Sequence, residues 1–61
     1  MNTIYRITTR DGCSLVEYSD YVSVIDYLWM KRYDMTLLRI ETDYTYDVPS
    51  RRVITFIVDV G

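Results

Sequence analysis

Residues 19–33 read SDYVSVIDYLWMKRY, and no other segment of the 61-residue chain is long enough and periodic enough for a helix. Ser19 or Asp20 can act as its N-cap, because either side-chain oxygen can accept a hydrogen bond from a free backbone N–H. At 100° per residue one broad apolar face forms, and we expect it to pack on a sheet. This face consists of Tyr21, Val22, Ile25, Leu28 and Trp29.

The opposite side of this helix is more apolar than a solvent-facing side needs to be. It carries Tyr27 and Met30, with Val24 nearby, beside the carboxylates of Asp20 and Asp26. Single exposed apolar residues are ordinary on protein surfaces. As a group, however, tyrosine and methionine beside acids are typical of a contact surface, so we interpret this side as a candidate site for a protein partner.

Strand patterns flank the helix on both sides. Residues 3–9 and 13–18 alternate in polarity around Asp11-Gly12, which predicts a hairpin with a type I′ turn. Residues 36–46 and 51–60 give a second hairpin, joined by a turn over residues 47–50 with Pro49 at its first central position. The predicted fold is α+β: a single domain over residues 1–61 with the order ββαββ, an antiparallel sheet and one helix across it.

The last predicted strand is apolar on both faces, with Ile54, Phe56, Val58 and Val60 alternating with Val53 and Ile57. A strand of this kind lies inside a larger sheet or beneath a partner. Small domains also need extra stabilisation, but a lone Cys13 cannot form an internal disulfide and a chain without histidine offers no zinc set. We therefore expect a homodimer, with an interface at Leu37, Val53 and Ile57.

Charge and composition restrict the function further. The net charge is −2, every charged residue from 11 to 30 is acidic, and the basic residues collect elsewhere in the chain. This acidic excess disfavours binding to nucleic acid, which needs a basic stripe. Without histidine or a glycine-rich phosphate loop we predict no catalytic residues, no metal and no cofactor, so the chain is not expected to be an enzyme. No signal peptide or membrane span is apparent, and a single cysteine suits a reducing compartment, which predicts the host cytoplasm.

Several short motifs resemble the small dimeric uracil-DNA glycosylase inhibitors of Bacillus podophages. The shared features are the Asp11-Gly12 turn, the return strand ending Glu17-Tyr18, the helix opening Ser19-Asp20-Tyr21 and the strand Leu37-Leu38-Arg39-Ile40. The resemblance implies a dimer that mimics DNA and presents helix aromatics and carboxylates to the enzyme. It gives Tyr21 the role of the helix-opening aromatic, with Asp20 and Glu17 as acids beside it. The family has an acid where this chain has Val22, and it lacks the strand over residues 51–60.

Taken together, these patterns predict a phage or mobile-element protein that inhibits a host DNA-processing enzyme by DNA mimicry, with uracil-DNA glycosylase the favoured target. One alternative is an anti-CRISPR or other anti-defence binding protein, and another is a small structural or regulatory homodimerisation module. The predicted partner-binding residues are Glu17, Asp20, Tyr21, Val24, Asp26 and Tyr27.

Overall fold

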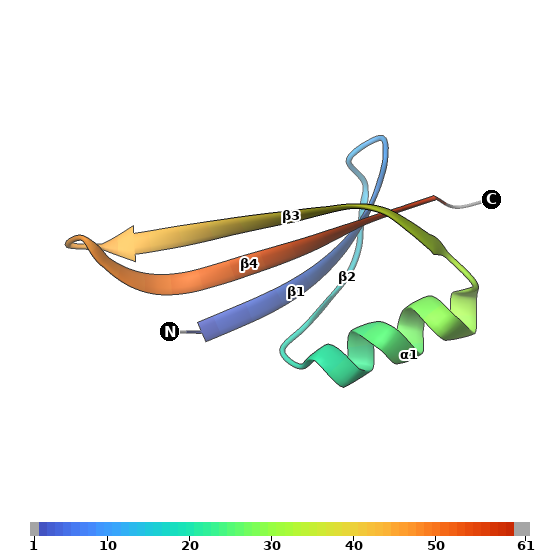
Figure 1. Cartoon of the computed structure of the whole chain (residues 1–61), viewed down its shortest axis with the longest axis horizontal. Coiled ribbons are helices and arrows are strands. Elements are labelled where there is room, and N and C mark those ends of the chain that lie inside the picture. The colour runs from blue at the N-terminus through green and yellow to red at the C-terminus, as the bar shows by residue number, and fades with distance from the viewer. Residues whose placement is uncertain (1, 60–61) are drawn as a thin grey trace.

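The computed structural model describes residues 2–59, which form two hairpins joined by one helix (Figure 1). The elements are β1 (Asn2–Thr9), β2 (Ser14–Tyr18), α1 (Tyr21–Lys31), β3 (Asp34–Thr45) and β4 (Val48–Asp59). The predicted α+β class and the ββαββ order are therefore confirmed. Val60, which was expected at the end of the last strand, lies outside the described residues.

The sheet is mixed, so the prediction of a purely antiparallel sheet is wrong. Its strand order is β2-β1-β4-β3, and the two central strands, β1 and β4, run parallel with Tyr5 opposite Ile54 and Ile7 opposite Phe56. Both hairpins are antiparallel, as expected. Their pairing through the first and last strands places β4 between β1 and β3, with α1 over one of its faces. On the other face Val53 and Thr55 are each only 6% exposed, so their own chain already covers them.

The two hairpin turns differ from their predicted types. In the first, Gly12 has φ 91° while Asp11 stays at negative φ, and the Gly12 N–H donates to the Thr9 carbonyl at 3.1 Å. This is a three-residue loop with glycine in its left-handed position, not a type I′ turn. Positive φ at both central residues occurs instead at Tyr46 (49°) and Asp47 (64°). The second turn is therefore shorter than predicted, and β4 already begins at Val48.

Helix α1 docks on the sheet through a different face from the predicted one. Val24 is 0% exposed and joins Ile7, Phe56 and Val58 in the core. Tyr27 and Leu28 are partly buried against this cluster. Leu28 was predicted to dock and does, but three other predicted docking residues are exposed: Val22, Ile25 and Trp29. The helix is apolar on most of its circumference, so periodicity alone could not select the face that packs.

Tyrosine contacts fix the orientation of α1. The Tyr27 ring lies 6.2 Å from that of Tyr18 at the end of β2, whereas the Tyr21 ring lies 6.4 Å from that of Phe56 on β4. The helix consequently lies over β1, β2 and the part of β4 around Phe56 and Val58. The rest of the β3–β4 hairpin extends beyond it to give a molecule 42 Å long and 14 Å thick (Figure 1). Leu38 and Ile40, on the helix side of β3, stay exposed.

Candidate protein-binding surface

Glu17 does not lie with the other predicted binding residues. It is opposite Arg6 in the β1–β2 register, and the Arg6 guanidinium contacts its carboxylate at 3.3 Å. Ile7, the next residue of β1, points into the core beneath α1, so Arg6 and Glu17 point to the other face of the sheet. Glu17 therefore belongs to a different surface from the start of the helix.

Asp20 and Tyr21 are held firmly at the start of α1. The Ser23 N–H donates to Asp20 Oδ2 at 3.0 Å, so the Asp20 side chain is the N-cap of the helix. The Tyr21 ring lies 5.9 Å from the Tyr5 ring and 6.4 Å from that of Phe56, yet 53% of the residue remains exposed. Its position is thus fixed by the core while one side of the ring is open to a partner.

Val24 and Tyr27 support the helix from within. Val24 is fully buried, so its side chain is not available to a partner. Tyr27 is half-buried between Tyr18 and Tyr33, with ring centroids 6.2 and 6.1 Å away. Burial, reinforced by the neighbouring Tyr33 and Tyr18, raises the pKa of Tyr27 above its ordinary value of 10.0. Both residues therefore contribute to packing, and the predicted site loses two of its members.

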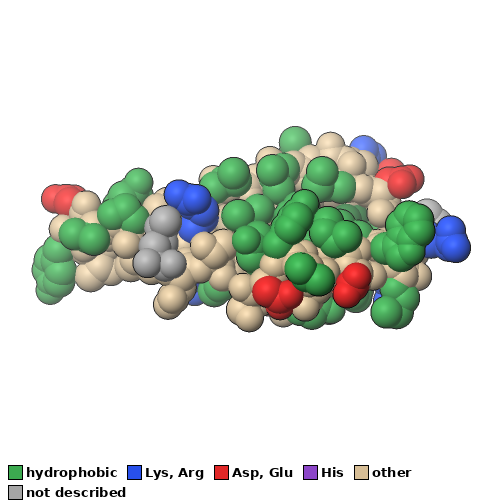
Figure 2. All heavy atoms as spheres, turned by 60° about the horizontal axis from the view of Figure 1, so that its bottom comes forward, with side chains coloured by type: hydrophobic (Ala, Val, Ile, Leu, Met, Phe, Trp, Pro, Cys, Tyr) green, Lys and Arg blue, Asp and Glu red, His purple; other side chains and the backbone are tan. Residues whose placement is uncertain are grey.

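Five of the residues that α1 exposes form one continuous strip, which we call the helix outer face. It consists of Val22, Ile25, Asp26, Trp29 and Met30, which follow each other at helical spacings of three and four. Trp29 is 80% exposed. Figure 2, in which the helix side comes forward, shows apolar side chains gathered here with acidic side chains beside them. Of the predicted binding residues, Asp26 lies on this face, and Asp20 and Tyr21 adjoin its start.

The sequence analysis did not predict that Val22, Ile25 and Trp29 lie at the surface, because it placed them on the helix face that packs against the sheet. The chain did contain a signal for the alternative. Val24, Tyr27 and Leu28 lie at helical spacings of three and four and make a second apolar stripe, which overlaps the predicted one at Leu28. The bulk of the tyrosines in β1 and β2 decides between the two stripes, since these rings contact Tyr21 and Tyr27.

The opposite face of the sheet is more polar than the dimer prediction assumed. Val53 is only 6% exposed, so its own chain already covers most of it, and Ile57 is half-buried; Leu37 alone of the predicted interface is well exposed. A shallow hollow of about 260 Å³ on this face is lined by Arg6, Arg10, Arg39 and Glu41, among others. Glu17 pairs with Arg6 and Glu41 lies in the hollow, so carboxylates offset much of the positive charge.

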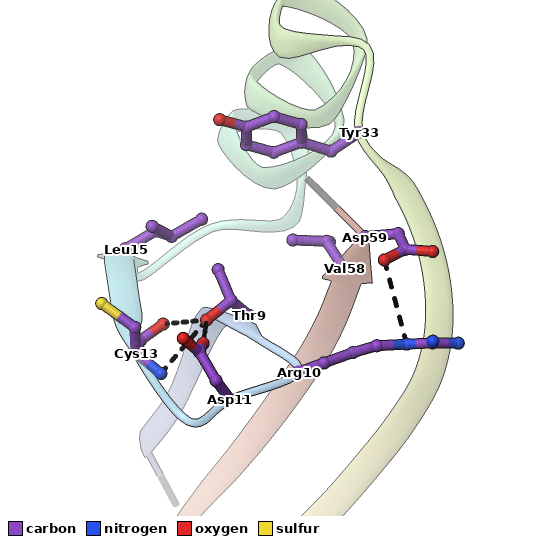
Figure 3. Close-up of a pocket in the computed structure, with 8 residues that line it drawn as sticks. All are labelled: Thr9, Arg10, Asp11, Cys13, Leu15, Tyr33, Val58 and Asp59. Carbon is purple, nitrogen blue, oxygen red and sulfur yellow. Dashed lines mark hydrogen bonds and ion pairs between the residues drawn. The ribbon is translucent and has the colours of Figure 1, made fainter. Parts of the chain in front are cut away.

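A second hollow, shown in Figure 3, lies between the β1–β2 turn and the end of α1. The Thr9 hydroxyl donates to the Asp11 carboxylate and accepts the Cys13 N–H at 3.2 Å. The hydrogen bond from Thr9, followed by one from the backbone of Cys13 to the same carboxylate, lowers the pKa of Asp11 below its ordinary value of 3.8. The polar groups of this hollow thus hold the turn in place, and Arg10 reaches Asp59 across it at 3.9 Å.

No family model matches the chain, and neither curated proteins nor solved structures give a match. Within residues 2–59, no three His, Cys, Asp or Glu side chains come together as a metal set. The helix of this described part is too short to cross a membrane. The surface is the remaining guide to what the protein binds, and on α1 the helix outer face exposes large apolar side chains, Trp29 above all.

Proposed function

We propose that this protein binds and inhibits a host DNA-processing enzyme, with uracil-DNA glycosylase the favoured target, and that the helix outer face makes the contact. The observation that carries the proposal is the exposure of Trp29 within an apolar strip bordered by Asp20 and Asp26. Exposed apolar residues that occur singly need no explanation, but a contiguous strip with a polar border is typical of interaction sites.

The two kinds of side chain would act at different stages of binding. The carboxylates of Asp20 and Asp26 steer the protein toward a basic groove and orient it there. Trp29 and its apolar neighbours supply most of the affinity once water is excluded, since tryptophan is prominent among the residues that dominate interface energies. The surface therefore suits a partner whose own site is basic with an apolar centre.

An enzyme that handles DNA has a site of this kind, because DNA presents regular negative charge beside flat apolar bases. Tyr21 and Trp29 offer flat rings. Asp20 supplies negative charge beside Tyr21 at the start of α1, and Asp26 supplies it beside Trp29 on the helix outer face. The contacts of Tyr21 with Tyr5 and Phe56 hold its ring in place before binding. Such preorganisation reduces the entropy lost on association.

The direct test is uracil excision by a bacterial uracil-DNA glycosylase with the protein added at equimolar concentration. We expect the wild-type chain to abolish excision, and Trp29→Ala to weaken inhibition by roughly 30-fold or more, as at a central interface residue. Asp26→Asn and Asp20→Ser should mainly slow association and reduce its dependence on salt. Asp20→Ser removes the charge but keeps an N-cap, so folding is preserved.

Tyr46→Asn provides a matched control for Trp29→Ala. Tyr46 is also highly exposed but lies in the β3–β4 turn, and asparagine tolerates its left-handed backbone. This variant should inhibit as well as wild type. Full excision in the presence of the wild-type protein would exclude uracil-DNA glycosylase as the target. Inhibition that survives Trp29→Ala unchanged would exclude the helix outer face as the contact.

A nuclease of a host defence system is the second candidate, because a basic DNA groove is common to both classes of enzyme. Capture from a bacterial lysate by immobilised wild-type protein, with immobilised Trp29→Ala as the negative control, separates the two candidates. A nuclease retained by wild type alone would favour the anti-defence function, and a glycosylase retained by wild type alone would favour the first proposal.

A further inference from the structure

Strand β3 is an exposed edge of the sheet, and along its middle it has no bulge, although Arg39 and Glu41 place charge there. It pairs with β4 on one side only, and its twelve residues, Asp34–Thr45, contain no proline or lysine. Its apolar side chains are well exposed, Ile40 to 59%. Edge strands with free backbone N–H and C=O groups readily pair with another strand, so natural proteins usually block them.

The regular part of β3 is bounded by irregularities at both ends. The register with β4 shifts between Met35 and Leu37, and again between Asp43 and Tyr44. Residues 37–43 between these shifts pair continuously with β4. This seven-residue segment can therefore accept a second strand along its free side, with on average one inter-strand hydrogen bond per residue.

The same segment is complementary to itself. If two copies run antiparallel with Ile40 opposite Ile40, then Arg39 of each copy lies opposite Glu41 of the other. Residues directly opposite in an antiparallel pair share a face, so two ion pairs would form on one face and the two isoleucines would meet on the other. Centring the pair on Arg39 would oppose two guanidiniums. Centring it on Glu41 would oppose two carboxylates and place Arg39 opposite Asp43, whose carboxylate is already paired with Arg51 at 2.9 Å. Charge thus selects the register centred on Ile40.

We infer that β3 is the interface for a second copy of this chain, paired antiparallel through residues 37–43 with reciprocal Arg39–Glu41 ion pairs. This inference does not depend on the proposed function. It places the dimer at the edge of the sheet and away from the polar face where Val53 is already covered. Two four-stranded sheets joined in this way form one eight-stranded sheet.

The geometry of such a dimer follows from the position of α1. An antiparallel edge-to-edge pair has its two-fold axis perpendicular to the sheet, so both helices lie on the same side of it. Because each helix lies over β1, β2 and part of β4, only the two β3 strands stay open between the helices. Leu38 and Ile40 of both copies then form an apolar floor between the two helices.

Charge exchange tests the interface and its register together. Molar mass is measured by sedimentation equilibrium for wild type, Arg39→Glu, Glu41→Arg, the double variant and an equimolar mixture of the two single variants. Each single variant opposes like charges twice, which should weaken the dimer by about 10- to 100-fold. The double variant restores both pairs, and the mixture should form a heterodimer because its opposed charges are all of opposite sign.

Arg52→Glu is the matched control, since Arg52 is an exposed arginine of β4 and lies outside the edge. It should dimerise as wild type does. A wild-type chain that stays monomeric at several hundred micromolar would overturn the inference. So would single variants that dimerise normally, or a mixture that fails to associate while both variants keep the wild-type circular dichroism spectrum.

Amide hydrogen exchange gives a second, independent measurement. In the dimer, the N–H groups of residues 37–43 that point away from β4 should be protected, and Arg39→Glu at the same concentration should expose them. Protection that is equal in wild type and Arg39→Glu, or absent in both, would contradict edge pairing. A change confined to α1 would locate self-association on the helix outer face instead.

Discussion

Alanine substitution at Val24 and at Trp29 should affect stability in the opposite order to their sizes. Val24 is fully buried among Ile7, Phe56 and Val58. Val24→Ala removes two methyl-sized groups, about 1.6 kcal/mol of transfer free energy, and leaves a cavity of roughly 40 Å³ that adds about 1 kcal/mol. We expect a loss of about 2–3 kcal/mol, a large share of the roughly 3–9 kcal/mol available to a chain of this length.

Trp29 contributes far less to the folded monomer despite its size. With 80% of it exposed, only about 50 Å² of a side chain of ~250 Å² is buried, corresponding to about 1.2 kcal/mol. Alanine also has a higher helix propensity than tryptophan, which offsets about 0.5 kcal/mol of this loss in the free energy of unfolding. The net cost of Trp29→Ala should therefore be below about 1 kcal/mol.

Thermal and urea unfolding, followed by circular dichroism, measures both variants without relying on the single tryptophan. All samples are compared at one protein concentration, because self-association would otherwise shift the transition. Val24→Ala should lower the melting temperature by roughly 8–24 °C and Trp29→Ala by less than about 8 °C. If Trp29→Ala were the more destabilising variant, α1 would pack through the face predicted from periodicity, and the binding surface assigned to it would not exist.

Three further variants test local features of the structure. Asp20→Ala should cost about 1 kcal/mol in urea unfolding through loss of the N-cap, whereas Asp20→Ser should cost only a few tenths. Gly12→Ala should cost about 1–2 kcal/mol through its φ of 91° alone, because no atom lies within 4 Å of an added Cβ, and Gly12→Asn should cost less. The raised pKa of Tyr27 means that the folded state favours the protonated hydroxyl. Its contribution to the free energy of unfolding is therefore fully present below pH 10 and is lost as the pH rises through the pKa of the folded state. Tyr27→Phe should flatten that alkaline loss in unfolding curves measured between pH 9 and 11.

The sequence was sufficient for the order of elements because each signal there is local. Asp11-Gly12 marks a turn, and residues 19–33 have no strand alternative. The pairing of β1 with β4 could not be predicted in the same way, because two amphipathic hairpins can join through any of their outer strands. The apolar pattern of β4 indicated that this strand lies inside the sheet. It did not indicate that β1 is the strand that pairs with it.

The site was less predictable than the fold for a related reason. Asp20 and Asp26 are exposed, as their predicted role requires, and Tyr21, expected to pack on the sheet, is 53% exposed, whereas Val24 and Trp29 exchanged their expected environments. The choice between two apolar stripes depends on tyrosine rings contributed by β1 and β2, which are remote in sequence. The second turn was predicted too late in the chain, because Pro49 was taken as its first central residue. The central residues are instead Tyr46 and Asp47, which both have positive φ, and Pro49 lies in β4.

The off-centre position of α1 also bears on how long a dilute molecule survives in a cell. One half of the sheet is covered by the helix, but β3 has backbone groups and apolar side chains open to any chain it meets. A protein with little free energy in reserve unfolds often enough for proteases to act on it, and association protects it by mass action. We therefore expect abundance itself to set the half-life of this protein: scarce copies are degraded, and plentiful copies persist.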